Sequence, residues 1–321
     1  MPSTPDLLDR RLLFFTGKGG VGKTTVSAAM ALLAAQQGQR VLLVSADGKG
    51  DIAAFFEHQP VGFRPENVYP GLDAMAMDTE ASLHEYLRLN VRVPIPGRLG
   101  PMARALDFVA TAAPGVREIL TVGKICWEVR EALEGRADWD LVVVDAAATG
   151  HIVGQLGAPQ AIEELVQVGP IRSQTGWMGD ILSDPATTAL NVVVTPEEMP
   201  VQETIELVAR VRAELSVPLG AVVVNRVLPE LFTRSEEAAF EALREPEAEH
   251  ALASVTGPGV GSVLEAASLA VTLRRTRAAH LAHLRESVDL PLLYLPELFV
   301  RAQGMRVTRM VAEALGEELG L

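Results

Sequence analysis

Short runs of consecutive apolar residues recur along the chain and are separated by longer stretches with helical spacing. We expect buried strands at residues 12–15, 40–45, 72–78, 141–145, 190–195, 219–225 and 290–295. Helices are expected in between, among them 26–35, 201–215 and 236–250. Strands that are apolar on both faces and alternate with helices are typical of a mostly parallel sheet flanked by helices. The pattern therefore predicts an α/β fold.

One long interval between two expected strands is helical. From Thr79 to about Gly135 the spacing is that of helices, broken by residues 94–97 and 114–115, which are rich in proline and glycine. We predict a helical subdomain at 79–135, inserted into a single domain that spans 1–321. Its clearest apolar stripe comprises Val122, Ile125, Cys126, Val129 and Leu133. Such a stripe fits ordinary core packing, and it also fits the wall of a groove for an apolar client.

A glycine-rich sequence, TGKGGVGKTT at residues 16–25, joins the first expected strand to the first expected helix. Its spacing is G-x-x-x-x-G-K-[ST], in which backbone N–H groups hold phosphates at a helix N-terminus. Lys23 would reach the β and γ phosphates, and the Thr24 hydroxyl would bind Mg²⁺. We therefore predict a P-loop NTPase that uses ATP and Mg²⁺. The expected nucleotide-binding residues of this loop are Gly17, Lys18, Gly19, Gly20, Val21, Gly22, Lys23, Thr24 and Thr25.

Acidic residues follow two of the expected strands. Asp47 comes after residues 40–45, and Asp145 ends the run 141–145. Ligands of open parallel sheets bind at the carboxyl ends of strands, so both aspartates are expected near the phosphate loop. Asp145 is placed to hold Mg²⁺ through water, opposite Thr24, and Asp47 to orient the attacking water. Capping of the next helix is the alternative role for Asp47.

Two further features resemble a known family. Lys18, one residue after the first glycine, resembles the signature lysine of deviant phosphate loops, which reaches the nucleotide held by an opposing subunit. The sequence DAAATGH, from Asp145 to His151, is similar to the second switch of the ArsA-like ATPases, whose usual form is D-T-A-P-T-G-H. The chain thus resembles the ArsA-like ATPases, which include the arsenite-pump and tail-anchored-protein targeting ATPases.

The resemblance implies hydrolysis of ATP in a site between two subunits, which are either identical or a related sister pair. It implies catalytic roles for Lys18, Lys23 and Asp47. Hydrolysis would drive a switch that reshapes the helical interval 79–135, where relatives receive cargo, here an apolar client or a membrane-protein partner. The implied switch residues are Asp47, Asp145, Thr149, Gly150 and His151. The implied adenine contacts are Asn225, for which turn formation is the alternative, and Pro296.

The sequence departs from the family in the first switch. Where the family usually has Asp-Pro, this chain has Asp47-Gly48. The hydrolysis rate is therefore left open. An ATP-binding scaffold or holdase with negligible hydrolysis is one alternative function, and a soluble subunit of an anion transporter is another.

Composition narrows the partners and the compartment. With 28 Lys plus Arg against 41 Asp plus Glu, the net charge is −13, which opposes broad nucleic-acid binding. Cys126 is the single cysteine, so an internal disulfide framework is excluded, as is a cysteine-rich metal or metalloid site. No long uncharged apolar run occurs, so we expect no direct membrane insertion, no signal peptide and a cytoplasmic location.

Overall fold

The computed structural model describes residues 6–48, 52–90, 115–165, 170–230, 232–257, 259–300 and 303–321. The strands are β1 (Leu12–Thr16), β2 (Val41–Ser45), β3 (Glu66–Tyr69), β4 (Leu72–Ala76), β5 (Leu141–Asp145), β6 (Thr188–Val194), β7 (Leu219–Val227) and β8 (Leu292–Pro296). The helices are η1 (Leu7–Asp9), α1 (Lys23–Gln36), η2 (Ile52–Phe56), α2 (Thr79–Asn90), α4 (Val116–Leu133), α5 (Thr149–Leu165), α6 (Pro170–Ser183), α7 (Glu198–Glu214), α8 (Arg234–Leu243), α9 (Pro246–Thr256), α10 (Val260–Ser287) and α11 (Met305–Leu319).

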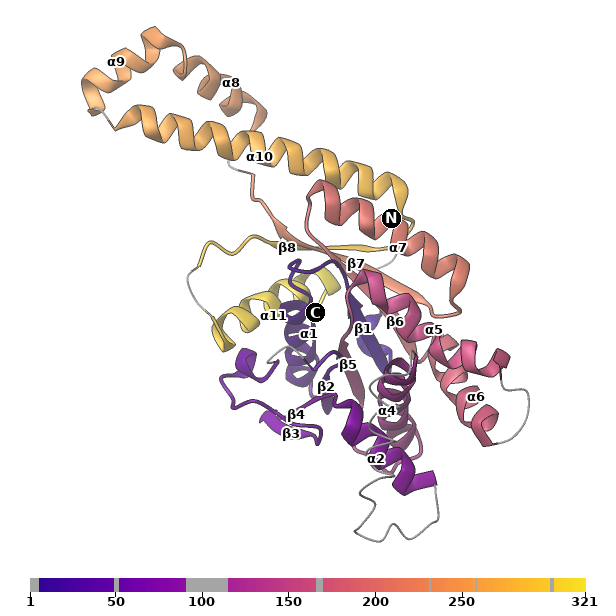
Figure 1. Cartoon of the computed structure of the whole chain (residues 1–321). Helices are drawn as coiled ribbons and strands as arrows, with labels where there is room; N and C mark the ends of the chain where they lie inside the picture. The colour runs from indigo at the N-terminus through magenta and orange to yellow at the C-terminus, as the bar shows by residue number, and fades with distance from the viewer. Residues whose placement is uncertain are drawn as a thin grey trace.

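The strands form one eight-stranded sheet in the order β3-β4-β2-β5-β1-β6-β7-β8 (Figure 1). Every neighbouring pair is parallel except β3 and β4. β1 lies in the middle, between β5 and β6. The loop that follows β1 therefore emerges where the chain winds away in both directions, which is the place where open α/β sheets bind ligands. The predicted α/β P-loop fold is confirmed.

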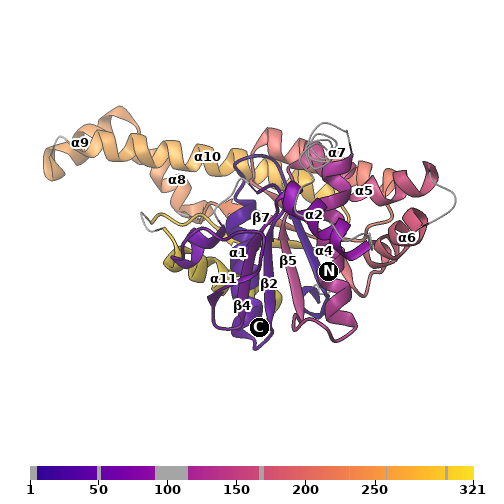
Figure 2. The same ribbon diagram turned by 60° about the horizontal axis from the view of Figure 1, so that its bottom comes forward.

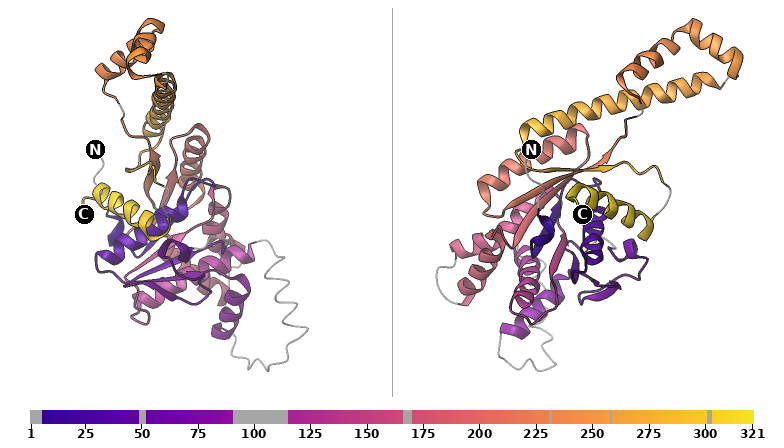
Figure 3. Two further views of the ribbon diagram at one scale, coloured as in Figure 1. Left: turned by 90° about the vertical axis from the view of Figure 1, so that its left-hand side faces the viewer. Right: turned by 180° about the vertical axis from the view of Figure 1, so that it is seen from behind.

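Both faces of the sheet are apolar. Each face is covered by its own set of helices (Figure 3). Phe14 and Val144 belong to the core under α4, α5, α6 and α7. Phe15 and Val143 point to the other side and pack against α1 and α11. The buried face of α1 is rich in alanine, and these small side chains let it lie close to the sheet. Within the described ranges, no helix is both long and apolar enough to cross a bilayer.

One strand was not expected from the sequence. β3 reads Glu-Asn-Val-Tyr and pairs antiparallel with β4 at the edge of the sheet. An edge strand is paired on one side only and tolerates polar side chains, so it carried no apolar signal. The structure also moves several expected boundaries: β4 ends at Ala76, β7 continues to Val227, and β8 starts at Leu292 and runs through Pro296. The expected break at 94–97 lies outside the described residues.

Helices α8, α9 and α10 form an arm that projects from the body beyond the end of β7 (Figure 1). Its tip has a small core of its own, made by Phe240, Leu264 and Val271, with Phe232 stacked on Phe240 at 5.2 Å between ring centroids. The carboxyl-terminal half of α10 packs against α7, and Leu284 is fully buried there. A single helix over 236–250 was expected. The chain instead breaks into α8 and α9, with Pro246 in the first turn of α9, where its missing N–H costs nothing.

Candidate nucleotide site

The phosphate loop is packed too tightly for side chains at two of its glycines. A Cβ on Gly17 would lie 2.2 Å from the Val193 carbonyl oxygen, and one on Gly22 would lie 2.4 Å from Asn225 Nδ2. Gly22 also has a φ of 93°, in the region that favours glycine, and it caps α1. The first turn of α1 begins at Lys23, so the unpaired N–H groups of a helix N-terminus meet the loop here.

Thr24 and Asp145 face each other beneath this loop. The Thr24 hydroxyl donates to Oδ2 of Asp145 at 2.7 Å, while the other carboxylate oxygen, Oδ1, is buried without a hydrogen-bond partner. Burial raises the pKa of Asp145 to about 6, against the hydrogen bond from Thr24 and the charge of Lys23. A hydroxyl beside an unsatisfied carboxylate oxygen is a donor set that Mg²⁺ prefers. These residues fit the predicted metal.

Asp47 lies at the exposed end of β2, close enough to Asp145 for its charge to raise the pKa of Asp145 further. Its backbone carbonyl accepts a hydrogen bond from Nη2 of Arg117 at 3.2 Å. Arg117 belongs to the first turn of α4, so the helical interval directly touches the loop for which a first-switch role is expected. We did not assign Arg117 a role from the sequence, because its partner is 70 residues away along the chain.

Lys18 is held by a carboxylate of its own chain. Its Nζ lies 2.5 Å from Oε1 of Glu203 on α7, and each of these side chains is 31% exposed. The other oxygen of Glu203, Oε2, accepts a hydrogen bond from the Thr149 hydroxyl at 3.2 Å. Thr149 begins α5, and the next residues, Gly150 and His151, are exposed in its first turn. The structure thus brings the loop lysine and the expected second switch together through Glu203, a residue with no role assigned from the sequence.

Asn225 and Pro296 lie at the ends of neighbouring strands. The Asn225 amide donates to the Val21 carbonyl at 2.8 Å, and its side-chain oxygen accepts from the Arg226 N–H at 2.9 Å. Arg226 has a φ of 58°, an uncommon value for a residue with a side chain. Pro296 pairs with Val227 at the end of β8. Asn225 therefore buttresses the phosphate loop, and contact of Asn225 or Pro296 with adenine stays a prediction.

A cavity of about 300 Å³ opens between α2, α4, α5 and α6. Its wall is mainly apolar and includes Leu120, Trp127, Ile162, Trp177 and Met178. The stripe that the sequence singled out faces elsewhere. Val122, Ile125, Cys126 and Val129 pack into the core on one face of the sheet, and Leu133 is 53% exposed. Burial also raises the pKa of the Cys126 thiol, as expected for a packing residue.

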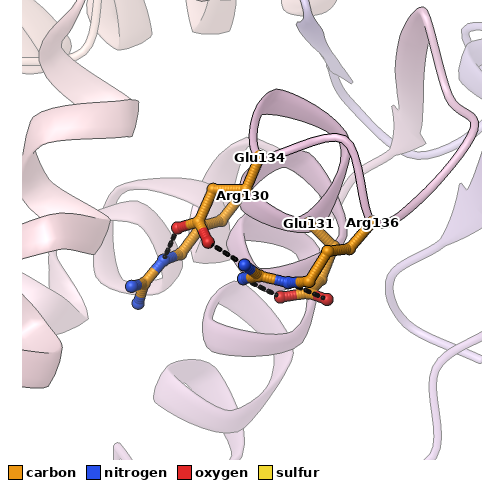
Figure 4. Close-up of polar contacts among 4 residues, drawn as sticks. All are labelled: Arg130, Glu131, Glu134 and Arg136. Atoms are coloured by element: carbon orange, nitrogen blue, oxygen red, sulfur yellow. Dashed lines mark hydrogen bonds and ion pairs between the residues drawn. The ribbon is translucent and has the colours of Figure 1, made fainter.

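Ion pairs join residues of the last turn of α4 to the residues that follow it, beside this cavity (Figure 4). Arg130 binds Glu134 at 2.8 Å and lies over the Trp177 ring at 5.1 Å from its centroid. Arg136 binds Glu131 at 2.6 Å and also pairs with Glu134. The hydrogen bond from Arg136 is the main cause of the lowered pKa of Glu131. Arg130 thus lines the apolar cavity and contacts both Glu134 and Trp177.

Comparison with known proteins identifies the family of the chain. The anion-transporting ATPase (ArsA) family matches residues 10–176 and 167–251. The ATPase BagA of Mycobacterium tuberculosis is 33% identical over 300 residues, which cover 89% of this chain and 87% of BagA. The chain belongs to the anion-transporting ATPase family.

More distant relatives include the arsenical pump-driving ATPases of Acidiphilium multivorum and Escherichia coli. Each is 32% identical over 241 residues, or 68% of this chain. The alignment spans 40% of the Acidiphilium protein and 39% of the Escherichia protein. The family is one of ATPases, which supports ATP binding by this chain.

Proposed function

We propose that this chain is an ATP hydrolase whose site is completed when two subunits, identical or closely related, meet at the carboxyl edges of their sheets. In this proposal Lys18 of each subunit reaches the phosphates held by the other. Hydrolysis then switches the pair between two conformations and acts on a bound client. ATP and Mg²⁺ are the cofactors.

The observation that carries the proposal is the pairing of Thr24 with Asp145. A buried carboxylate with an unpartnered oxygen costs stability, and a hydroxyl on its other oxygen does not remove that cost. A divalent cation would satisfy it. Because the pair lies at the N-terminus of α1, where Lys23 adds its charge, the place also suits a triphosphate.

The chain's own residues divide the work as follows. Lys23 and the loop N–H groups would offset the negative charge of the β and γ phosphates. Thr24 and Asp145, the latter through water, would hold Mg²⁺, which neutralises phosphate charge during transfer. Asp47 would accept a hydrogen bond from the attacking water and orient it. Lys18 from the neighbouring subunit would stabilise the charge that develops in the transition state.

A second function, ATP binding with negligible hydrolysis, is favoured by one observation in the first switch. Gly48 has a φ of 63°, and a Cβ there would lie 2.6 Å from the Met77 carbonyl oxygen. Proline, the usual residue of the family at this place, is restricted to φ near −65° and cannot adopt this conformation. The loop that carries Asp47 therefore follows a different path from an Asp-Pro turn, which bears directly on how Asp47 meets water.

The client part of the proposal is supported by the cavity between α2, α4, α5 and α6. Its apolar wall suits an apolar segment of a client or of a membrane-protein partner. Arg117 links the start of α4 to the first switch, so a change at Asp47 has a direct path to this wall. An arsenical cargo is not part of the proposal, because Cys126 is the single cysteine and is fully buried.

Phosphate release from Mg²⁺-ATP tests the hydrolase proposal. We expect Lys23→Ala and Asp47→Asn to lower the rate on the order of a hundredfold, the size of effect for removing one preorganised catalytic group. Glu206→Gln, a change on the exposed side of α7, is the matched control and should keep the wild-type rate. If wild type releases phosphate at the same background rate as both site variants while still binding ATP, the hydrolase proposal is wrong and the ATP-binding scaffold is favoured.

A further inference from the structure

Glu203 is the point at which three parts of the site meet. Its carboxylate is contributed by α7, which follows β6 at the carboxyl edge of the sheet (Figure 2). One oxygen binds Lys18 of the phosphate loop and the other accepts from Thr149 of the second switch. The loop and the switch also touch directly, since the Thr149 N–H lies 3.4 Å from the Gly17 carbonyl oxygen. A shift of Lys18 therefore changes the surroundings of Thr149.

The Lys18 ammonium has two competing partners in the proposed cycle. In the single subunit it binds Glu203, and in the proposed pair it binds phosphates across the interface. Both side chains are 31% exposed, and ion pairs with this much solvent contact are weak. A triphosphate carries more negative charge than one carboxylate, so its arrival can displace Glu203. A pair of this strength favours the position of Lys18 at Glu203 and still allows exchange.

We propose that Glu203 is a positioning residue that retains Lys18 in its own subunit until the phosphates of the neighbouring subunit displace it, and that transmits this displacement to Thr149. The inference rests on the proposed function, because Lys18 must act on the other subunit's nucleotide. It adds a control step that neither the motif nor the family match assigns. In subunits without nucleotide, Lys18 stays bound to Glu203 of its own subunit, so pairing of subunits depends on bound ATP.

The contact itself is tested on the single subunit without nucleotide. Lys18, Lys23, Lys49 and Lys124 are the lysines of the chain, so acetylation by acetic anhydride can be followed at each by mass spectrometry. Acetylation of Lys18 must break its ion pair with Glu203, so removing the carboxylate should speed the reaction. We expect Glu203→Gln to raise the acetylation rate of Lys18 relative to Lys23 by roughly two- to fivefold, the effect of losing a partly exposed ion pair. Glu206→Gln should leave the ratio unchanged. An unchanged ratio in both Glu203→Gln and Glu203→Ala would overturn the proposal.

The consequence for pairing is tested by sedimentation while Mg²⁺ and ATPγS are titrated together. We expect Glu203→Gln to lower the nucleotide concentration for half-maximal association by roughly two- to fivefold. Lys18→Ala should weaken association, and adding Glu203→Gln to it should change nothing more, because the carboxylate then has no lysine to hold. A purely structural role of Glu203 would shift both backgrounds alike.

The two proposals fail in different ways. If Lys18→Ala associates like wild type, the role of Lys18 in the neighbouring site is wrong and the proposed function falls. If Lys18→Ala weakens association but Glu203→Gln matches wild type, the proposed function stands and the role of Glu203 is overturned. An equal shift of Glu203→Gln in both backgrounds also overturns it.

Discussion

Burial perturbs the carboxyl of Asp145, and the effect of its titration on stability has a definite sign. Its folded-state pKa, about 6, lies above the ordinary value of 3.8, chiefly because the group is buried. The folded protein therefore binds a proton more readily than the unfolded chain between these two values. Ionised Asp145 costs stability fully above about pH 6, and the cost fades as the pH falls toward 3.8.

Asp145→Asn should stabilise the protein when metal and nucleotide are absent. We expect the free energy of unfolding at pH 7.5 to rise by about 1–3 kcal/mol, and the gain to shrink to about half at pH 5. Denaturant unfolding in EDTA at the two pH values measures this. Asp184→Asn is a control of opposite sign, because hydrogen bonds from Thr187 and Ala186 lower the pKa of Asp184. A gain for Asp145→Asn that does not change with pH would contradict the burial argument.

The phosphate loop offers a matched pair of glycines. Gly22→Ala forces a Cβ toward Asn225 at a φ of 93°, whereas Gly19 has no atom within 4 Å of its added Cβ and no positive φ. We expect Gly22→Ala to lower the free energy of unfolding by about 1–3 kcal/mol and to weaken ATP binding at least tenfold. Gly19→Ala should leave stability near wild type. Thermal unfolding and fluorescent-nucleotide titration report the two effects, and equal losses at both positions would refute the packing explanation.

At the scale of elements, α4 connects the loop of Asp47 to the apolar cavity between α2, α4, α5 and α6. Its first turn binds Asp47 through Arg117, and its middle lines the cavity. Near its end, Val129 is buried in the core and Arg130 lies over the Trp177 ring of α6. A helix held at its far end and contacted at its near end transmits a movement of the near end as a tilt. The cavity wall is what such a tilt would change.

Arg117→Ala should therefore separate nucleotide binding from the response of the cavity. Trp127 and Trp177 line the cavity, so their fluorescence reports on its shape. We expect the change in tryptophan fluorescence on adding Mg²⁺ and ATPγS to fall at least twofold, while nucleotide affinity changes less than about threefold, because one exposed hydrogen bond is lost. Arg210→Ala, which breaks an exposed pair on α7, is the control. A full fluorescence response in Arg117→Ala would exclude this route.

At the scale of the whole molecule, stability is divided unequally. The two large cores lie on the two faces of the sheet, while the arm tip depends on a small cluster around Phe240. Elements with few buried apolar neighbours open without global unfolding. The tip of the arm should therefore behave as a separate unit of local stability.

Phe240→Ala should loosen the arm tip and leave the body intact. Deleting a buried aromatic side chain costs about 3–5 kcal/mol, more than so small a core can absorb. We expect faster amide hydrogen exchange over residues 232–271 with little change in the strands. Val208→Ala, in the core beneath the sheet, should instead lower the global melting temperature. Unaltered exchange in the arm of Phe240→Ala would show that the tip is held by other contacts.

The sequence was most informative where local chemistry decides structure. Continuous apolar runs gave seven of the strands, and the glycine spacing placed the phosphate loop at the end of β1. The pattern missed β3, because its residues are polar and it pairs only at the edge of the sheet. It also missed the break between α8 and α9 before Pro246. Glu203 and Arg117 were missed for another reason, since their partners lie 185 and 70 residues away. Such contacts depend on the order of the strands, which no local pattern encodes.

The burial of Cys126 gives the molecule a practical property. A sole thiol at 0% exposure is inert to maleimides in the native state, so the natural chain already serves as a background for site-directed dye labelling. A Val255→Cys variant would carry one fluorophore at a single known position in α9, where Val255 is 85% exposed. Energy transfer from that dye to a labelled nucleotide would then show whether the distance between the arm and the nucleotide changes when Mg²⁺ and ATP are added.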